Sequence, residues 1–594
     1  MSSTATVSDF IVDRLHQWGV ERVYGYSGDG INGVMSALRR AEDRITLVQP
    51  RHEELAAFMA CGHAKYTDRP GVVVTTSGPG AIHALNGLYD AAKDHMPVVA
   101  VIGQQARLSL GSDFQQEVDL ESVFRDVGAY VQTVVAPAQA RHVVDRALRI
   151  AEAERTVTCV IVPNDIQDAP MAEPPAGHGA TWSGVGYRPS RRLPADTDLD
   201  QAAEILNAGE KVAILAGAGV KDAVPQLLDL AEALGAGIAK AVLAKTMIPD
   251  DAPGVTGTIG LLGTEPSDRM MRHCDTLLMV GTSFPYAEFL PESGQARAVQ
   301  IDIDAANLGL RYPTEVNLHG DARATLEALR QRVEPKTDRA WRDDVQEQIE
   351  DWWDTVAARA NTGADPLNPQ KIFWELSARL PDNALLAADV GTATDWYARF
   401  LKIRGGVQGS TSGGLASMGN GVPYALAAKF AHPDRPVIAM VGDGAMQMIG
   451  NNGLITVAKY WRDWSDPRLI VLVLNNRDLN QVTWEQRVME GDPKFESSQA
   501  LPDFDYDRYA EMLGLTGVRL DHPDRVEAVL DDALAADRPV VINAVVDANV
   551  PPLPTHLEMS QVKGYMQSIL KGDPEAGAEI RQSLKAMAAK YLKR

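Results

Sequence analysis

The chain has 594 residues, of which 45% are hydrophobic and 23% are charged. These are ordinary values for a folded protein, and at roughly 100 to 200 residues per domain the length predicts three or four domains. The 57 Lys and Arg residues against 79 Asp and Glu residues give a net charge of −22, which disfavours general binding to nucleic acid. Any phosphate must therefore bind in a local site.

The few cysteines and the amino terminus indicate the compartment. Cys61, Cys159 and Cys274 are too few and too scattered for a disulfide framework or a zinc site, which favours a reducing cytoplasm. The amino terminus lacks a basic segment followed by an apolar one, and no apolar run reaches roughly 18 residues. We expect a protein that is neither exported nor membrane-spanning.

Short apolar, β-branched runs alternate with helical stretches in three parts of the chain. Such runs predict buried parallel strands, so we expect an α/β protein with three doubly wound parallel sheets. The expected units are a first domain at 1–188, a central domain at 189–335, a linker helix at 336–368, a third domain at 369–550 and a carboxyl-terminal tail at 551–594.

An internal repeat relates the first and third parts. The sequence Asp-Arg-Pro at 68–70 and again at 434–436 leads each time into a strand, a Gly-rich turn, a helix and another strand. This pattern predicts two copies of one fold, with a site built between them.

The third copy places Asp443 between Gly442 and Gly444 at the expected end of a strand. Two glycines let the backbone approach a ligand closely, and the amides of Ala445 and Met446 at a helix start would face an anion. Taken alone, such a triplet also makes ordinary turns.

Asn475 and Asn476 end the next expected strand, and in a parallel sheet this brings an amide oxygen beside Asp443. Carboxylate, amide, carbonyl and phosphate oxygens together suit Mg²⁺. The pair of motifs therefore favours a site for a metal and a phosphate over a plain turn.

Glu53 begins an apolar segment that is expected to be helical. It is either a favourable charge at a helix start or a buried acid that faces a heterocycle nitrogen. His52 and His83 are expected to be core histidines.

The ordered motifs RHEE, SGPGAIHALNGL, GLASMGNGVPYALAAKF, GDGAM and LVLNN resemble the thiamine diphosphate enzymes of the acetolactate synthase and pyruvate oxidase group. The resemblance covers nearly the whole chain. The central segments GVTGTIG, GTSFPY and QIDID and the tail segment KGYMQSIL are most similar to bacterial pyruvate oxidase and pyruvate:quinone oxidoreductase.

The resemblance implies roles for particular residues. Glu53 would hydrogen-bond the aminopyrimidine ring and serve as the catalytic acid, and Met418 would bend the cofactor. Asp443, Asn476 and the carbonyl of Asp478 would hold Mg²⁺. The implied contacts to the cofactor further include Gly391, Thr392, Gly442, Gly444, Ala445 and Met446 for the diphosphate, and Ser77, Gly78 and Asn86 for the surface over the pyrimidine. Since family members bind the cofactor between chains, a homodimer or homotetramer is expected.

A Gly-rich turn at Gly217 and Gly219 is by itself a weak dinucleotide signal. The resemblance implies FAD in the central domain, with contacts from Thr256, Gly257, Thr282, Phe284, Asp302, Asp304 and Asp321. In synthases of the family the flavin is structural, and in oxidases it accepts two electrons.

The expected substrate pocket departs from the family pattern. Relatives usually have Phe-Gln-Glu, whereas this chain has Phe114-Gln115-Gln116-Glu117, which is either a one-residue shift or a placement of Gln115 at the aromatic position. In addition, Asn480 and Gln481, followed by Val482, replace an expected Gly-aromatic or Gly-Met pair. These amides favour a substrate with more hydrogen-bonding groups.

The end of the chain predicts an amphipathic helix, with Ile580, Leu584, Met587 and Tyr591 at helical spacing among basic residues. It is either a helix docked on its own protein or a peripheral membrane contact at the inner face of the membrane. The choice between quinone and oxygen as electron acceptor depends on which reading holds.

The favoured function is decarboxylation of a 2-oxo acid, first of all pyruvate, on thiamine diphosphate, with oxidation of the hydroxyethyl intermediate through FAD to quinone or oxygen. The alternative is a carboligase of the acetolactate synthase type with structural FAD. A degenerate, non-catalytic family member is disfavoured because Glu53, Asp443 and Asn476 are all present.

Overall fold

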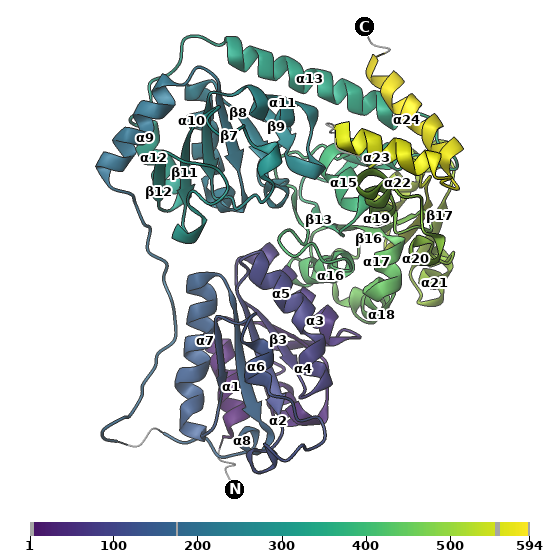
Figure 1. The fold of residues 1–594 in the computed structure, drawn as a ribbon. Coiled ribbons are helices and arrows are strands. Elements are labelled where there is room, and N and C mark those ends of the chain that lie inside the picture. The colour runs from purple at the N-terminus through teal and green to yellow at the C-terminus, as the bar shows by residue number, and fades with distance from the viewer. Residues whose placement is uncertain (1–4, 174–175, 553–558, 592–594) are drawn as a thin grey trace.

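The computed structural model describes residues 5–173, 176–552 and 559–591, without the side chains of 559–560, 584 and 586–591. Three six-stranded sheets, each flanked by helices, form three α/β units (Figure 1). The strand pairings within them are parallel. The predicted fold class is confirmed.

The first sheet has the strand order β2-β1-β3-β4-β6-β5. Its elements are α1 (Val7–Gln17), β1 (Arg22–Gly25), α2 (Asn32–Arg40), β2 (Thr46–Val48), α3 (Glu53–Thr67), β3 (Gly71–Thr75), α4 (Pro79–His83), α5 (Leu85–Lys93), β4 (Val98–Gln104), α6 (Leu120–Phe124), β5 (Tyr130–Thr133), α7 (Ala140–Glu154), β6 (Val157–Pro163) and α8 (Asn164–Gln167).

The third sheet repeats this order as β14-β13-β15-β16-β18-β17, which confirms the internal repeat. Its elements are α14 (Pro369–Arg379), β13 (Leu385–Ala388), α15 (Thr392–Phe400), β14 (Gln408–Ser410), α16 (Gly421–Ala431), β15 (Val437–Gly442), α17 (Asp443–Ala445), α18 (Asn451–Tyr460), β16 (Leu469–Asn475), α19 (Asn480–Glu485), α20 (Glu496–Gln499), α21 (Tyr506–Met512), β17 (Thr516–Leu520), α22 (Val526–Leu534) and β18 (Val540–Val545).

The middle sheet differs, with the order β12-β11-β10-β7-β8-β9, so it is a separate doubly wound fold between the two copies. Its elements are α9 (Asp196–Ala208), β7 (Val212–Ala216), α10 (Val224–Leu234), β8 (Gly237–Lys240), β9 (Val255–Thr258), α11 (Glu265–His273), β10 (Thr276–Val280), β11 (Arg297–Asp302), β12 (Val316–His319) and α12 (Ala322–Arg330).

Two connections join the units. The extended segment that leads into α9 runs along the left edge of Figure 1. Helix α13 (Ala340–Ala360) crosses from the middle to the third unit and buries Val345, Trp352 and Val356 on one face. The limits predicted for the five parts of the chain stay predictions.

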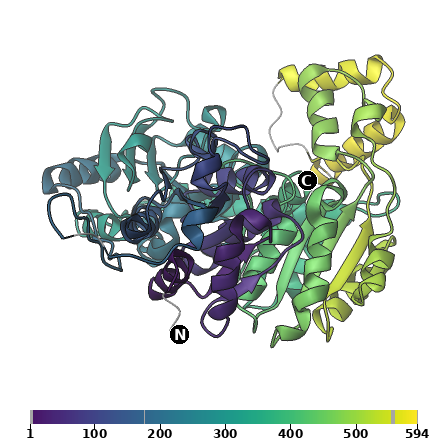
Figure 2. The ribbon, with the colours of Figure 1, turned by 90° about the horizontal axis from the view of Figure 1, so that it is seen from below.

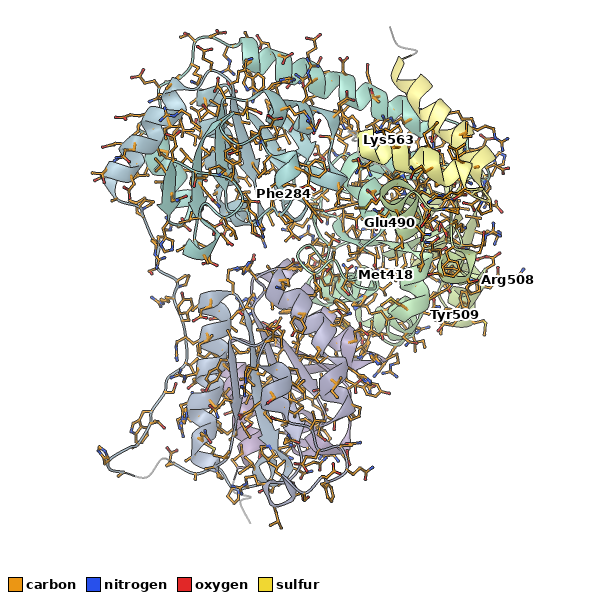
Figure 3. All side chains as sticks on the ribbon, in the orientation of Figure 1. Phe284, Met418, Glu490, Arg508, Tyr509 and Lys563 are labelled. Carbon is orange, nitrogen blue, oxygen red and sulfur yellow. The ribbon has the colours of Figure 1, made fainter. Side chains whose placement is uncertain are left out.

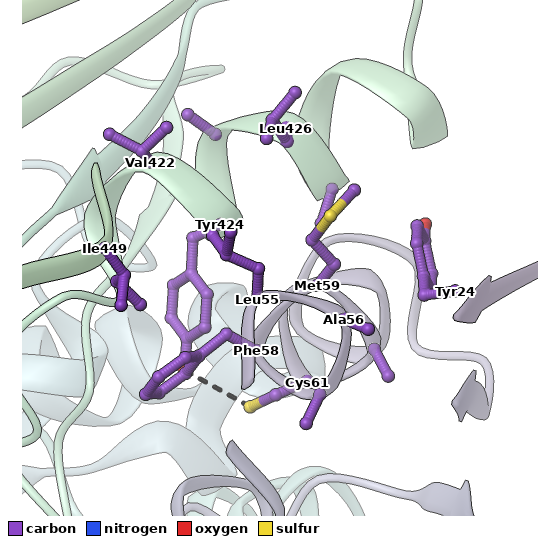
Figure 4. Close-up of a cluster of buried hydrophobic side chains, with 14 of the residues drawn as sticks. Tyr24, Leu55, Ala56, Phe58, Met59, Cys61, Val422, Tyr424, Leu426 and Ile449 are labelled. Atoms are coloured by element: carbon purple, nitrogen blue, oxygen red, sulfur yellow. Dashed lines mark hydrogen bonds between the residues drawn. The ribbon is translucent and has the colours of Figure 1, made fainter. Parts of the chain in front are cut away.

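The first and third units share one apolar core. Helix α16 packs on α3, and buried side chains of both helices belong to a single cluster (Figure 4). The Tyr424 ring lies edge-on to Phe58 at a centroid distance of 6.4 Å, and its hydroxyl is 3.2 Å from the Cys61 sulfur. The two copies therefore share one continuous buried core.

The tail forms α23 (Met559–Leu570) and α24 (Ala576–Tyr591), which lie with helices of the third unit at one end of the molecule (Figure 2). On α24, Glu579 and Gln582 are buried, whereas Ile580 is 41% exposed. The predicted apolar positions Leu584, Met587 and Tyr591 have side chains outside the described residues. No helix in the described part of the chain is long and apolar enough to cross a membrane.

Candidate active site

The residues predicted to bind metal and diphosphate lie at one edge of the third sheet. Strands β13, β15 and β16 are neighbours, with Ala388 paired to Met440 and Gly442 paired to Leu474. The segments that follow these strands therefore leave the sheet at the same edge, because all three strands are parallel. The structure brings together Gly391, Thr392, Gly442, Asp443, Gly444, Ala445, Met446, Asn476 and Asp478.

Asp443 is buried at this edge and ties two of the segments together. Its carboxylate accepts the backbone N–H of Gly444 at 2.9 Å, of Asn476 at 3.0 Å and of Arg477 at 2.6 Å. Burial raises the pKa of Asp443 to about 7, because the charged form loses its water. A divalent cation beside the carboxylate would favour the charged form.

The two asparagines that end β16 have different surroundings. The side chain of Asn475 is buried and donates to the Asn543 side chain at 3.0 Å, inside the sheet. The amide oxygen of Asn476 accepts the N–H of Asp478 at 3.1 Å and stays at the edge. The Asp478 carboxylate accepts from Thr483 at 3.0 Å and pairs with Lys494 at 3.2 Å.

Space for a bound group lies beside two of the glycines. A Cβ built on Gly391 (φ +108°) or on Gly442 would meet no described atom within 4 Å. A Cβ on Gly444 would instead lie 3.6 Å from the Met418 sulfur, which places Met418 beside the turn. The donors here are hard oxygens, so Asp443, Asn476 and the Asp478 carbonyl fit Mg²⁺.

Glu53 is the first residue of α3 and is only 7% exposed. Its Oε2 is 3.0 Å from Nδ1 of His83, whose ring stacks on His52 at a centroid distance of 4.5 Å. The expectation of a core histidine is wrong for His83, whose side chain is 44% exposed. His83 is thus a site residue that sequence reasoning missed, and only its place at the end of the SGPGAIH motif could have indicated it.

Residues predicted from two separate motifs meet at the turn that follows β3. The Ser77 hydroxyl donates to the Gln116 side chain at 3.4 Å. A Cβ on Gly78 (φ +58°) would lie 2.8 Å from that of Gln116. Gln116 therefore contacts the turn after β3, and both Gln115 and Gln116 are exposed.

Asn86 connects the first and third units of the same chain. Its amide nitrogen donates to Glu54 at 2.6 Å and to the Ser417 hydroxyl at 3.0 Å. Asn86 thus links the start of α3 to the residue that precedes Met418. Its predicted place opposite a second chain stays a prediction.

Three family models match the chain in order. They are the N-terminal TPP binding domain of thiamine pyrophosphate enzymes over 5–123, the central domain over 199–329 and the C-terminal TPP binding domain over 389–544. The chain belongs to the thiamine pyrophosphate enzyme family. The two binding-domain matches contain the two sheet edges described above, so this is a thiamine pyrophosphate-dependent enzyme.

Curated relatives span nearly the whole chain. It is 34% identical to the putative thiamine pyrophosphate-containing protein YdaP of Bacillus subtilis over 566 residues, which is 95% of this chain and 96% of that one. It is 30% identical to a pyruvate oxidase of Lactiplantibacillus plantarum over 91% of this chain and 88% of that one. It is 28% identical to the acetolactate synthase isozyme 3 large subunit of Escherichia coli over 94% and 96%.

In this thiamine pyrophosphate enzyme, three residues predicted to face the substrate lie on α19: Asn480, Gln481 and Val482. Their surroundings differ. Asn480 is buried, and its amide donates to Asp478 at 3.2 Å and to the Ala548 carbonyl at 2.8 Å. Gln481 donates to Glu485 at 3.0 Å, and Val482 is 51% exposed. The Asn480 amide therefore holds the loop that follows β16, and contact of these three residues with substrate stays a prediction.

Three glycines of the middle unit allow neighbouring segments to pack closely. A Cβ on Gly217 would lie 2.3 Å from the Gly281 carbonyl oxygen, and one on Gly219 would lie 2.7 Å from Gly281 Cα. Gly257 has φ +106°, and a Cβ there would lie 2.5 Å from Thr264. A larger residue at any of these positions would force a loop to move, whether or not FAD binds.

Five other residues predicted to contact FAD lie at or after the carboxyl ends of β10, β11 and β12, namely Thr282, Phe284, Asp302, Asp304 and Asp321, whereas Thr256 lies near the start of β9. Figure 3 labels Phe284 in the middle unit. Asp304 and Asp321 each accept a backbone N–H at 2.9 Å as helix caps. Thr256 shares a hydrogen bond with Ser267 at 2.7 Å. Burial raises the pKa of Asp302. Thr282 follows β10, with its hydroxyl accepting the N–H of Phe284 at 3.2 Å.

Proposed function

We propose that this enzyme decarboxylates a 2-oxo acid, with pyruvate as the first candidate, and passes the electrons to FAD and then to quinone or oxygen. The observation that carries the proposal is the gathering of Asp443, Asn476 and Met418 at one sheet edge, with a buried Glu53 in the first unit. Bound thiamine diphosphate would supply a carbanion that attacks the keto carbon and an electron sink for the released pair.

The protein's own groups would do three things. Asp443 and Asn476 would hold Mg²⁺ against the diphosphate, since both oxygens lie at the strand ends. Glu53 would hold a proton at a pyrimidine nitrogen, and its burial strengthens that hydrogen bond. His83, in contact with Glu53 and partly exposed, would exchange this proton with solvent.

The fate of the electrons separates two candidates. Similarity to a pyruvate oxidase supports FAD as an electron acceptor. Similarity to acetolactate synthases supports the second candidate, a carboligase in which FAD has only a structural role.

The deciding experiment adds a panel of 2-oxo acids to the purified holoenzyme without oxygen, and follows carbon dioxide release and flavin absorbance together. Carbon dioxide release with bleaching of the flavin supports the oxidase. Carbon dioxide release with an unchanged flavin and a condensed product supports the carboligase. Absence of both with every acid would refute decarboxylation.

We also propose a homodimer or homotetramer in the cytoplasm, with the tail docked on its own chain. Leu108 and Phe114, near Gln116, are 97% and 52% exposed, as expected for side chains covered by a second copy. Light scattering measures the mass. Co-sedimentation with anionic vesicles tests the alternative of a peripheral membrane contact, for which exposed Ile580 is the motive.

A further inference from the structure

The segment 411–421 leads from the end of β14 to the first residue of α16. It carries Met418 to the edge of the third sheet where Asp443 and Asn476 lie, which we call the metal edge because these residues are proposed to hold Mg²⁺. Up to the first residue of α16 it forms neither helix nor strand, and Ala416 (φ +53°) and Gly419 (φ +102°) are in the left-handed region. Its position therefore depends on contacts with other parts of the chain. At its end, Asp389 accepts the N–H groups of Gly419 at 2.8 Å and Gly421 at 2.7 Å.

The start of the segment is held by Asp94, which follows α5 of the first unit. The Asp94 carboxylate accepts the N–H of Gly413 at 3.0 Å and of Gly414 at 2.5 Å. Lys65 pairs with the same carboxylate and donates to the Thr411 carbonyl at 2.7 Å. Among the described residues, this carboxylate thus forms its hydrogen bonds with the segment and with the lysine that also holds it.

Asp90 lies one turn earlier on α5 and holds a part of the segment that is connected to the residue before Met418. It accepts the Ser412 hydroxyl at 2.5 Å and the Tyr424 hydroxyl. The Ser412 oxygen in turn accepts the N–H of Ser417 at 2.8 Å. This chain of bonds ends at the residue next to Met418, and Asp90 is fully buried along it.

Close packing leaves the segment little freedom. A Cβ on Gly414 would lie 2.6 Å from the Lys93 carbonyl oxygen, and one on Gly413 would lie 2.6 Å from the Leu243 side chain. Hydrogen bonds to buried carboxylates are stronger and more directional than those between neutral groups. Loss of either carboxylate would leave buried N–H or O–H donors without an acceptor.

We propose that Asp90 and Asp94 are positioning residues, through which the first unit holds Met418 beside the Gly442-Asp443-Gly444 turn and so sets the shape of the cofactor bound to the third unit. The inference rests on the proposed function, because it concerns the conformation of bound thiamine diphosphate. It assigns to the first unit of one chain a role at the metal edge of that same chain.

The first test needs no cofactor. Asp94→Asn keeps the size of the side chain but turns an amide donor toward the N–H groups of Gly413 and Gly414. Amide hydrogen exchange in 411–421 should become at least about tenfold faster, since local opening sets exchange rates. Asp126→Asn is the matched control, because Asp126 accepts the Tyr89 hydroxyl of the same helix at 2.7 Å on the surface. Equal exchange rates in the two variants would overturn the proposal that Asp94 holds the segment.

The second test asks whether Asp94 affects the bound cofactor through the position of Met418. Deuterium exchange at C2 of bound thiamine diphosphate is measured by NMR in the parent, Asp94→Asn, Met418→Ala and the double variant. Misplacement by about 1 Å can cost roughly 100-fold in rate, so each single variant should slow the exchange by 10- to 100-fold. The double variant should be no slower than Met418→Ala, because both changes act on one side chain.

Additive losses would show that Asp94 supports the fold only, and would overturn the inference. A parent that binds no thiamine diphosphate would instead refute the proposed function, while the cofactor-free test still decides whether the carboxylates hold the segment. Ser412→Ala, which removes only the hydroxyl between Asp90 and the Ser417 N–H, replaces Asp94→Asn in both tests if that variant does not fold.

Discussion

A buried arginine holds the tail to the third unit. Arg487 lies in a π-helical turn, Gln486–Glu490, and its side chain is fully buried. It contacts Asp573 at 2.9 Å and Glu575 at 2.8 Å, which lie between α23 and α24, and Glu579 at 2.7 Å, which lies on α24. Figure 3 shows Glu490 beside the tail helix that carries Lys563. One guanidinium thus contacts three acidic side chains.

Arg487→Met keeps an apolar stem of similar length and removes the charge. Removing one partner of a buried ion pair costs about 3 to 5 kcal/mol, because the remaining charges stay buried without compensation. At about 1.4 kcal/mol per factor of ten, the undocked population of the tail should rise roughly 100- to 5,000-fold. Lys494, 3.1 Å from Glu575, offsets part of this loss.

Tail docking can be followed by tryptophan fluorescence, because Tyr565 of α23 stacks on Trp484 at a centroid distance of 6.0 Å. Amide exchange over 561–583 gives the same equilibrium independently. Lys571→Met is the matched control, since Lys571 pairs with Asp492 between the same two segments but on the surface, where a pair contributes about 0 to 1 kcal/mol. Equal protection of the tail in both variants would refute the reasoning.

Three further outcomes are expected. Glu53→Gln should keep the fold but slow C2 deuterium exchange of bound thiamine diphosphate by at least about 100-fold, because an amide cannot exchange the required proton; unchanged exchange by NMR would remove Glu53 from the reaction. Asp443→Ala should abolish Mg²⁺-dependent binding of thiamine diphosphate, and calorimetry with and without EDTA that gives parental affinity would leave Asp443 a purely structural role. Burial raises the pKa of Glu579 from its usual 4.5 to about 8, so the docked tail holds a proton that a free tail releases; docking should weaken as the pH rises from about 5 to about 8, and a flat fluorescence profile across that range would contradict this.

The gathering of Asp443 and Asn476 at one edge of the third sheet could be predicted because both residues follow from local patterns. Asp443 and Asn476 each come directly after an apolar run, and the carboxyl ends of parallel strands meet at one edge. The repeat was visible for the same reason, since strand, turn and helix recur in one order in both copies. What each glycine does could not be predicted: Gly217 and Gly219 are close to Gly281, which lies more than 60 residues away.

Contacts between distant segments explain the other misses. The contact of His83 with Glu53 depends on how α4 lies against the start of α3, which no periodicity encodes. The bond from the Asn480 amide to the Ala548 carbonyl, 68 positions further along the chain, was likewise not indicated by any local pattern. Arg487 is paired with residues 86 to 92 positions further along the chain, so neither its charge nor theirs indicated a buried cluster.

The repeated fold suggests that each copy could stand alone, but the core argues against it. Tyr424 and its neighbours on α16 are buried by α3, and a Cβ on Gly62 would lie 2.9 Å from that of Ala427. A fragment containing only the third unit would expose this helix face and also lose Asp90 and Asp94 as acceptors for 411–421. Because exposed apolar surface on that scale promotes association, the isolated unit should aggregate or bind thiamine diphosphate weakly. The edge of the third sheet that carries Asp443 and Asn476 should therefore depend on the first unit for its shape.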